Sequence, residues 1–463
     1  INFMSKHNTT TMQAAEMRAS VALSAIYALR MLGMFLMLPV LALYAAGLPG
    51  AENKPALIGL AMGMYGLTQA LLQLPLGMAS DRFGRKKVIY LGLAVFAFGS
   101  FMAAMATSLE MLVLARAVQG AGAVSAAVTA LLADLTREEV RTRAMAMIGL
   151  SIGVTFSVSL VLAPLFNHWI GVPGIFVLTG VLTVLSMLVV RFMVPDPVHS
   201  KLHEDAEVQR GELGTVLRNR QLLRLNFGIF ALHAAQMALF VALPFMLVHL
   251  GLAKSAHWHI YLPATMVGLV LMVPAIIYGE TRNRLKTVFV AGIAAIALAQ
   301  LGLAAGLASL WAVLAWMVLY FIGFNILEAT LPSMVSKIAP TRLKGTAMGV
   351  YNTAQSIGLF VGGAAGGLIW QHFGTNGVFV FCSGLMLCWL LLAATAPAPQ
   401  PVRNLMFAVG AAWQGREDGL QSALLQLAAV QAVSFSADGQ TVYIKALQQG
   451  FDREVAEKLI MGV

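Results

Sequence analysis

Twelve apolar segments constrain the fold of this chain more than any other feature of its sequence. Each has the roughly 20 or more residues that a helix needs to cross a bilayer. They span residues 19–46, 56–80, 86–107, 109–134, 143–168, 171–194, 222–250, 257–279, 287–307, 309–337, 344–371 and 374–395. Because lipid offers the backbone no hydrogen-bond partner, each segment is expected to form a helix. The sequence therefore predicts an all-α membrane protein with twelve transmembrane helices.

Composition and charge agree with this prediction. The chain is 59% apolar and only 11% charged, whereas soluble domains have about 25% charged residues. If the N-terminus is cytoplasmic, the loops carry their lysines and arginines on the cytoplasmic side, and only Lys54 and Lys254 face the other side. The positive-inside rule then places both termini in the cytoplasm. This distribution explains the net charge of +10 without a nucleic-acid partner.

The sequence also contains an internal repeat. A proline, an acid and an arginine recur at the same spacing 199 positions apart, as Pro75, Asp81 and Arg85 and then as Pro274, Glu280 and Arg284. We therefore expect two six-helix bundles, over residues 1–194 and 222–396. Residues 195–221 form a cytoplasmic linker with a short amphipathic helix near 208–219. Two related bundles predict a central cavity that opens alternately to each side.

A different pattern follows the proline-rich stretch that ends at Pro401. The expected elements are a strand at 402–409, a helix at 415–427, strands at 430–436 and 440–445, and a helix at 451–460. A turn at 437–439 joins the last two strands. This order predicts a small α+β cytoplasmic domain over 402–463, with a ferredoxin-like fold that lacks its last strand. Its balanced charge argues against nucleic-acid binding.

The turn between the second and third apolar segments is the most informative motif. It is a basic cluster with one acid, and its glycines allow helices to approach closely. Asp81 and Arg85 are four residues apart, so they can pair on one helix face. Such a contact can bias the equilibrium between inward- and outward-facing states. The simpler alternative is a solvated orientation signal.

These residues resemble the major facilitator superfamily, in particular its drug:proton antiporter group. Residues 77–89 resemble the superfamily's motif A, and residues 112–122 resemble its motif B. The resemblance implies that Asp134 pairs with the motif A arginine. The predicted gating residues are Gly77, Asp81, Arg82, Gly84, Arg85, Lys86 and Asp134, with Glu280 and Arg284 in the second half.

Four side chains inside the predicted helices are candidates for proton coupling. Glu328 is the only acid well inside a helix, so it is the first candidate. The resemblance gives Arg116 of motif B a coupling role, and Arg30 is a similar case. His233 can titrate in the physiological range. The alternatives are structural: a fixed ion pair of Glu328 with either arginine, or packing roles for the histidine and the arginines.

Seven amide side chains in the predicted helices are candidates to line a cavity or to form hydrogen bonds between helices. They are Gln69, Gln73, Asn226, Gln236, Asn325, Asn352 and Gln355. One departure from the antiporter pattern lies on the fifth helix. Gly149 and Gly153 remain there, but Ala163-Pro164 replaces the expected Gly-Pro. This departure weakens the case for antiport over other modes of coupling.

Together with this resemblance, the sequence predicts a secondary transporter of a bacterial inner (cell) membrane that exports a small molecule in exchange for protons, by alternating access. The alternatives are a sugar or metabolite facilitator or symporter, and a membrane sensor that signals through residues 402–463. Enzyme activity is not expected, because the chain has no nucleotide-binding phosphate loop and no metal-ligand cluster. Cys382 and Cys388 suggest neither a disulfide framework nor a metal site. The expected partners are lipid, substrate and protons, with no cofactor beyond the proton gradient, and the protein is expected to be a monomer.

Overall fold

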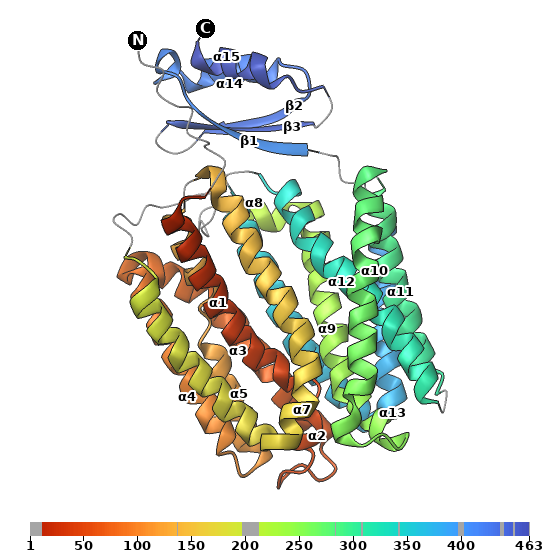
Figure 1. The fold of residues 1–463 in the computed structure, drawn as a ribbon. Helices are drawn as coiled ribbons and strands as arrows, with labels where there is room; N and C mark the ends of the chain where they lie inside the picture. The colour runs from red at the N-terminus through yellow and green to blue at the C-terminus, as the bar shows by residue number, and fades with distance from the viewer. Residues whose placement is uncertain are drawn as a thin grey trace.

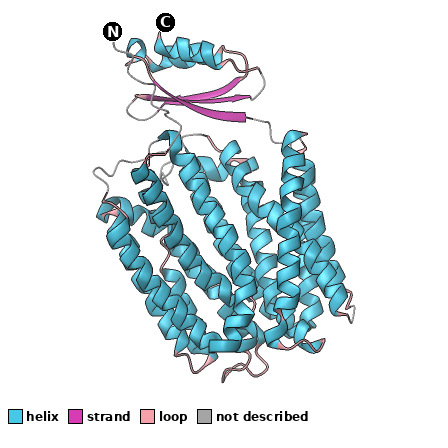
Figure 2. Cartoon of the chain, viewed as in Figure 1, coloured by secondary structure: helices cyan, strands magenta, loops and turns pink. Residues whose placement is uncertain are grey.

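The computed structural model describes residues 12–136, 138–196, 213–282, 284–306, 309–340, 343–396, 402–435, 439–447 and 450–462. Long helices form one bundle, and a small sheet with its own helices lies against one end of it (Figures 1 and 2). We call the end of the bundle that faces this sheet the sheet end, and the opposite end the far end.

The first half of the bundle contains seven helical elements. They are α1 (Ala14–Met37), α2 (Leu41–Ala45), α3 (Pro55–Phe83), α4 (Arg85–Ala104), α5 (Leu109–Ala121), α6 (Ser125–Asp134) and α7 (Glu138–Met193). Local signals set several boundaries. Pro55 opens α3, where its missing N–H costs nothing. Ser108 caps α5 by accepting from the backbone of Met111. Gly84, with φ of 101°, separates α3 from α4.

The second half repeats this arrangement after a short helix. Its elements are α8 (Leu213–Arg218), α9 (Arg220–His249), η2 (Lys254–Ala256), α10 (Trp258–Thr281), α11 (Leu285–Ala304), α12 (Leu310–Ile338) and α13 (Lys344–Ala394). The amphipathic helix expected near 208–219 corresponds to α8, and the residues before 213 lie outside the described part. The described residues include ten helical segments long and apolar enough to cross a membrane.

Helices α7 and α13 are unusually long, with 56 and 51 residues. Each is broken at one glycine, Gly171 with φ of 67° and Gly374 with φ of 70°. Such positive φ values are far from helical and are easily adopted only by glycine. Each helix also has more than twice the length that one crossing requires. The described residues of the twelve predicted apolar segments are therefore mostly helical, with short interruptions at 38–40 and 122–124, and four of the segments lie in these two broken helices.

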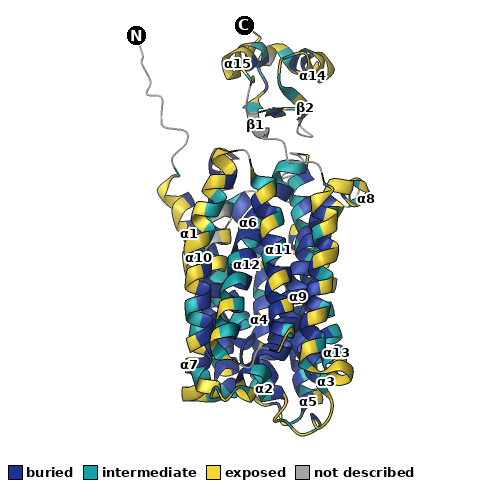
Figure 3. Cartoon of the chain, turned by 90° about the vertical axis from the view of Figure 1, so that its right-hand side faces the viewer, coloured by how far each residue is buried: buried dark blue, intermediate teal, exposed yellow. Residues whose placement is uncertain are grey.

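The outer surface of the bundle is apolar. On α7, for example, Val181, Leu188 and Phe192 are all exposed. Figure 3 shows buried residues inside the bundle and exposed residues along its outside. Soluble proteins rarely expose apolar patches of this extent. The surface is therefore suited to lipid.

The same hydrogen bond occurs at the equivalent place in each half. Lys86 donates to the Val194 carbonyl at 2.6 Å, and Lys286 donates to the Ala394 carbonyl at 2.8 Å. Both pairs are separated by 108 positions. In each half, this bond joins the first residues of a helix at the sheet end to the end of the sixth predicted apolar segment. The contact supports the internal repeat seen in the sequence.

The C-terminal elements occur in the predicted order. They are β1 (Val402–Ala408), η4 (Ala411–Trp413), α14 (Glu417–Leu425), β2 (Val430–Phe435), β3 (Thr441–Leu447) and α15 (Arg453–Met461). The strands form an antiparallel sheet in the order β1-β3-β2. Figure 1 shows α14 and α15 on the side of the sheet away from the bundle. Residues 436–438, which include most of the expected turn, lie outside the described part.

The two faces of β3 have different neighbours because side chains alternate along a strand. Val442, Ile444 and Ala446 belong to the core formed with α14 and α15. Lys445 belongs to the opposite face, and its Nζ donates to the Ile338 carbonyl at the last residue of α12, at 3.1 Å. The sheet is thus bonded directly to the sheet end of the bundle.

Candidate functional site

A cluster of three polar side chains lies in the second half of the bundle. His233 comes from α9, Glu328 from α12 and Gln355 from α13. The Nε2 atom of His233 lies 3.2 Å from Glu328 Oε1 and 2.7 Å from Gln355 Nε2. We call these three residues the proton cluster. The sequence singled out each of them, but only the fold shows that they meet.

The hydrogen bonds of His233 fix its tautomer. Its Nδ1 lies 3.2 Å from the Ile229 carbonyl, which can only accept, so Nδ1 carries a hydrogen. In a neutral imidazole the other nitrogen is then an acceptor. Nε2 therefore accepts from the amide of Gln355. A hydrogen between Nε2 and Glu328 is possible only if the cluster gains a proton, because an ionised carboxylate can only accept.

The proton cluster can hold one extra proton in two places. In one arrangement the proton makes Glu328 a carboxylic acid that faces a neutral imidazole. In the other it makes His233 an imidazolium that donates to a carboxylate, and the amide of Gln355 must then turn its oxygen toward the ring. Both arrangements keep the net charge of the carboxyl–imidazole pair at zero. This matters because a lone buried charge is costly.

An aromatic cluster covers Glu328 on its far-end side. Phe324, one turn before Glu328 on α12, packs on Phe156 of α7 with ring centroids 5.3 Å apart. Phe35 of α1 packs on the same ring at 5.1 Å. These rings join the two halves. The Glu328 side chain itself is 31% exposed, although its Oε1 is buried against His233.

Glycines pack the two halves together at the far end. A Cβ added to Gly59 of α3 would clash with the carbonyl oxygen of Gly363 on α13. Gly63 and Gly66 approach the backbone of α13 in the same way, at Phe360 and Ser356. Any side chain at these positions would separate the helices. The far end is therefore closed in this conformation.

The motif A residues form a compact ion network at the sheet end. Arg85 is 3% exposed and pairs with both Asp81 and Asp134, with its Nε 3.1 Å from Asp134 Oδ2. It also donates to Ser80 Oγ at 3.0 Å. Gly77 allows α3 to approach α6, since an added Cβ would lie 2.9 Å from the Ala126 methyl. The structure thus joins Asp81, Arg85 and Asp134 within the first half.

The remaining predicted gating residues are more exposed. Lys86 pairs with Asp196 at 2.8 Å, and Arg82 lies over the Phe83 ring. Glu280 and Arg284 are both exposed, and no ion pair between them occurs in the described part of the chain. Motif A is therefore only partly repeated in structure. Its second copy keeps the lysine contact and lacks the buried ion network.

Arg30 and Arg116 form a second polar cluster, inside the first half. Both are 2% exposed. Arg30 donates to Tyr65 Oη at 2.9 Å and to Ser125 Oγ at 3.2 Å. Arg116 donates to Gln119 and lies over the Tyr65 ring. Within the described residues, neither guanidinium pairs with a carboxylate. The expected alternative, in which Glu328 is a fixed partner of either arginine, is not the arrangement seen.

The glycines of motif B explain how Arg116 is buried. An added Cβ at Gly120 would clash with the Tyr65 carbonyl, and one at Gly122 would clash with the Gly92 carbonyl. The helix therefore contacts both α3 and α4 closely. Sequence reasoning missed Tyr65, which both arginines contact. Its position four residues before Gln69, on the same helix face, was the available signal.

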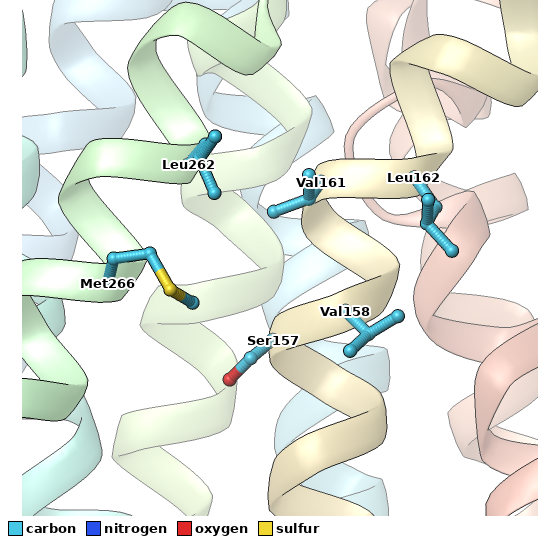
Figure 4. A pocket seen from close by; sticks show the side chains of 6 residues that line it. All are labelled: Ser157, Val158, Val161, Leu162, Leu262 and Met266. Atoms are coloured by element: carbon cyan, nitrogen blue, oxygen red, sulfur yellow. The ribbon is translucent and has the colours of Figure 1, made fainter.

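The other candidate amides are not part of the proton cluster. Gln69, Gln73, Asn226, Gln236 and Asn325 are buried, and Asn352 is half-buried. An apolar pocket of about 240 Å³ lies elsewhere, between α7 and α10 (Figure 4). Its lining residues are Ser157, Val158, Val161, Leu162, Leu262 and Met266. With one hydroxyl and no charged group, this pocket offers no proton chemistry.

Comparison with known proteins decides the family. The model of the Major Facilitator Superfamily matches residues 23–363 and 279–452. The inner membrane transport protein YajR of Escherichia coli (strain K12) is 41% identical over 438 residues, which cover 95% of this chain and 96% of YajR. This chain belongs to the major facilitator superfamily. The resemblance predicted from motifs A and B is thereby confirmed at the level of the superfamily, whose members are membrane transporters.

Two further comparisons extend this assignment. The multidrug resistance protein MdtH of Aeromonas salmonicida (strain A449) is 25% identical over 351 residues, which cover 75% of this chain and 86% of MdtH. The solved structure of a mutant of the nucleoside transporter NupG has a TM-score of 0.65 at 14% identity, and the match covers 81% of this chain and 99% of NupG. The structural likeness shows that the superfamily fold is shared.

Proposed function

We propose that this protein is a proton-coupled antiporter that exports a small molecule across the bacterial inner membrane. The observation that carries the proposal is the contact between Glu328 and His233. An acid and a base 3.2 Å apart, inside a membrane bundle, form a site that can take up and release one proton. The inner-membrane location of YajR and the multidrug resistance name of MdtH agree with this reading.

The proposed topology has twelve transmembrane helices, with α7 and α13 each counted as two at Gly171 and Gly374. The basic loops place the sheet end and both termini in the cytoplasm. The far end, closed by its glycines, then faces the periplasm. The described conformation is thus inward-facing in our proposal, and the C-terminal β-α-β-β-α unit is a ferredoxin-like domain without its last strand.

In the proposed cycle, protonation of the proton cluster and substrate binding alternate. A proton taken from the periplasmic side neutralises Glu328 and permits the inward-facing state. Release of this proton to the cytoplasm restores the Glu328 carboxylate. The protein then binds substrate and returns to the outward-facing state, where it releases the substrate. Asp81, Arg85 and Asp134 favour one of the two states through their ion network. Arg30 and Arg116 are proposed to couple this change to the first half.

Proteoliposomes that contain a pH-sensitive dye test the proposal. They are screened with cationic drugs, sugars and organic acids under an imposed pH gradient. A compound that discharges the gradient with the unmodified protein, but not with Glu328→Gln, supports proton-coupled transport and names its substrate class. Radiolabelled flux without proton movement would instead indicate a facilitator. Uptake together with protons would indicate a symporter.

A further inference from the structure

The inner face of α10 carries a line of buried polar groups that the proposed function does not use. His257, Tyr261 and Thr265 are four residues apart, so they lie on one helix face. Their side chains are 1%, 0% and 0% exposed, although much of α10 is exposed. Tyr261 packs on the Phe240 ring of α9, with centroids 6.0 Å apart. The line therefore faces the interior of the second half.

Each of these groups has a buried atom with no hydrogen-bond partner in the described part of the protein. The atoms are His257 Nε2, Tyr261 Oη and Thr265 Oγ1. Buried polar atoms are nearly always bonded, and this holds most strongly where lipid surrounds the protein. Three such atoms in a row along one helix are best satisfied by ordered water, which bonds two to four polar groups at once.

The line continues to Glu328 through α12. A Cβ added to Gly268, one turn beyond Thr265, would lie 2.9 Å from Asn325 Nδ2. The Asn325 amide therefore fills the notch at this glycine, and its Nδ2 also lacks a partner among the described residues. Glu328 follows one turn later on α12. At a rise of about 1.5 Å per residue, the line runs roughly 16 Å along α10 from His257 to Gly268, where it reaches α12.

This line bypasses the closed centre of the protein. The direct route from the far end to Glu328 is blocked by Gly59 and Gly363 and by the contact of Phe156 with Phe324. The polar line runs beside these barriers, between α9, α10 and α12. A proton can move along hydroxyl, imidazole and water groups through a space too narrow for a substrate.

We propose that His257, Tyr261 and Thr265, with ordered water that the Asn325 amide orients at the inner end, conduct protons from the far end to Glu328. The inference rests on the proposed role of Glu328 as the proton acceptor. In the net step, a hydronium ion at the far end becomes water and the Glu328 carboxylate becomes a carboxylic acid. Each imidazole, hydroxyl or water group on the path accepts one proton and passes another on, so its charge is restored, and it then turns back to accept the next proton. The Asn325 amide only orients water by hydrogen bonding.

Besides Tyr261, the titratable groups along this path lie at its two ends. Lys254 and Tyr261 are the neighbours of His257. The groups around Glu328 come from three helices: His233 of α9, Tyr320 of α12 and Tyr351 of α13. His257 is almost fully buried at the outer end. In the proposed path, movement of this ring admits protons and otherwise prevents a continuous leak.

The test measures the transient current that follows a pH jump on the far-end side of oriented proteoliposomes. The far end is first locked by a disulfide in the double variant Ala56→Cys and Gln371→Cys, because the Ala56 N–H donates to Gln371 Oε1 at 3.3 Å. In the locked protein, the inference predicts that the current persists. Tyr261→Phe with Thr265→Val should lower it about tenfold or more, since both changes remove only hydroxyls.

A matched control lies on the same helix. Tyr278→Phe with Thr281→Val removes the same two hydroxyls from exposed positions and should leave the current unchanged. An undiminished current in the Tyr261 and Thr265 variant would overturn the path. Loss of the current in the locked but otherwise unmodified protein would overturn it too. A current that survives Glu328→Gln would instead refute the proposed proton acceptor, so the two failures are distinguishable.

Discussion

His233 and Glu328 come from different helices, 95 positions apart in the sequence, yet Nε2 of the histidine lies 3.2 Å from Oε1 of the acid. Neither forms another ion pair in the described part of the protein. Within the described residues, the second half of the bundle thus contains this acid–base pair, and the first half contains two buried arginines, Arg30 and Arg116, that pair with no carboxylate. This asymmetry puts the proposed proton site in the second half.

The first prediction concerns the base of this pair. His233→Gln keeps a polar side chain of similar reach but removes the second position for the proton. We expect proton-driven transport to fall by about a hundredfold or more, within the range for loss of a positioned proton-transfer group. Gradient discharge in proteoliposomes measures the effect. His259→Gln, at an exposed far-end position, is the control, and equal activity of the two variants would contradict the role of His233.

The second prediction concerns the motif A network. Asp134 is fully buried against Arg85, whereas Asp196 pairs with Lys86 at the surface. Asp134→Asn should lower the free energy of unfolding by about 3–5 kcal/mol, because it breaks a buried ion pair. Asp196→Asn should change it little, because exposed pairs contribute little. Thermal unfolding in detergent compares the two, and equal melting temperatures would contradict the structural importance of the network.

The third prediction concerns closure of the far end. Gly363 lies so close to α3 that an added Cβ would be 2.6 Å from the Gly59 carbonyl. Gly363→Val should therefore prevent closure and expose residues that line the contact between α3 and α13. Labelling of a cysteine introduced at Ser356 should become at least several times faster. Gly384→Val, on the same helix where an added Cβ meets nothing, should leave labelling unchanged. Similar rates in both variants would show that these glycines do not close the far end.

The fourth prediction is a pH dependence of the contact between sheet and bundle. Burial lowers the pKa of Lys445 below its ordinary value of 10.5. The docked sheet therefore binds this proton less tightly than an undocked sheet would. Docking should strengthen as pH rises through the window from the lowered pKa to the ordinary value, and it is weakest below that window. Spin-label distances between β3 and α12 measure docking, and Lys445→Met should abolish the dependence. If the pH dependence of docking persists in Lys445→Met, a titratable group other than Lys445 causes it.

Much of the fold could be predicted from the sequence because lipid leaves few choices. The apolar segments predicted the helices, because a chain in a bilayer must form its backbone hydrogen bonds internally. The repeated Pro75 and Pro274 motifs indicated the two halves, and the turn signal at 437–439 indicated a strand on either side of it. The order of elements in the C-terminal domain was predictable for a different reason: strand and helix patterns are local in the sequence.

The candidate site was harder to predict because it depends on contacts between distant helices. Glu328, His233 and Gln355 were all singled out, but no periodicity shows which faces of three helices meet. Tyr65 was missed because a tyrosine in an apolar segment is usually interpreted as a packing residue. Gly59 and Gly363 were missed because only the backbone geometry distinguishes a packing glycine from any other glycine in a membrane helix.

One measurement tests the central claim most directly: infrared spectroscopy of the Glu328 carboxyl as pH changes. The account predicts a protonated-carboxyl band that appears on acidification, is absent from Glu328→Gln and shifts in His233→Gln, because the histidine contacts the acid. A spectrum of Glu328→Gln identical to that of the unmodified protein across the same pH range would show that Glu328 binds no proton, and it would contradict the proposed mechanism.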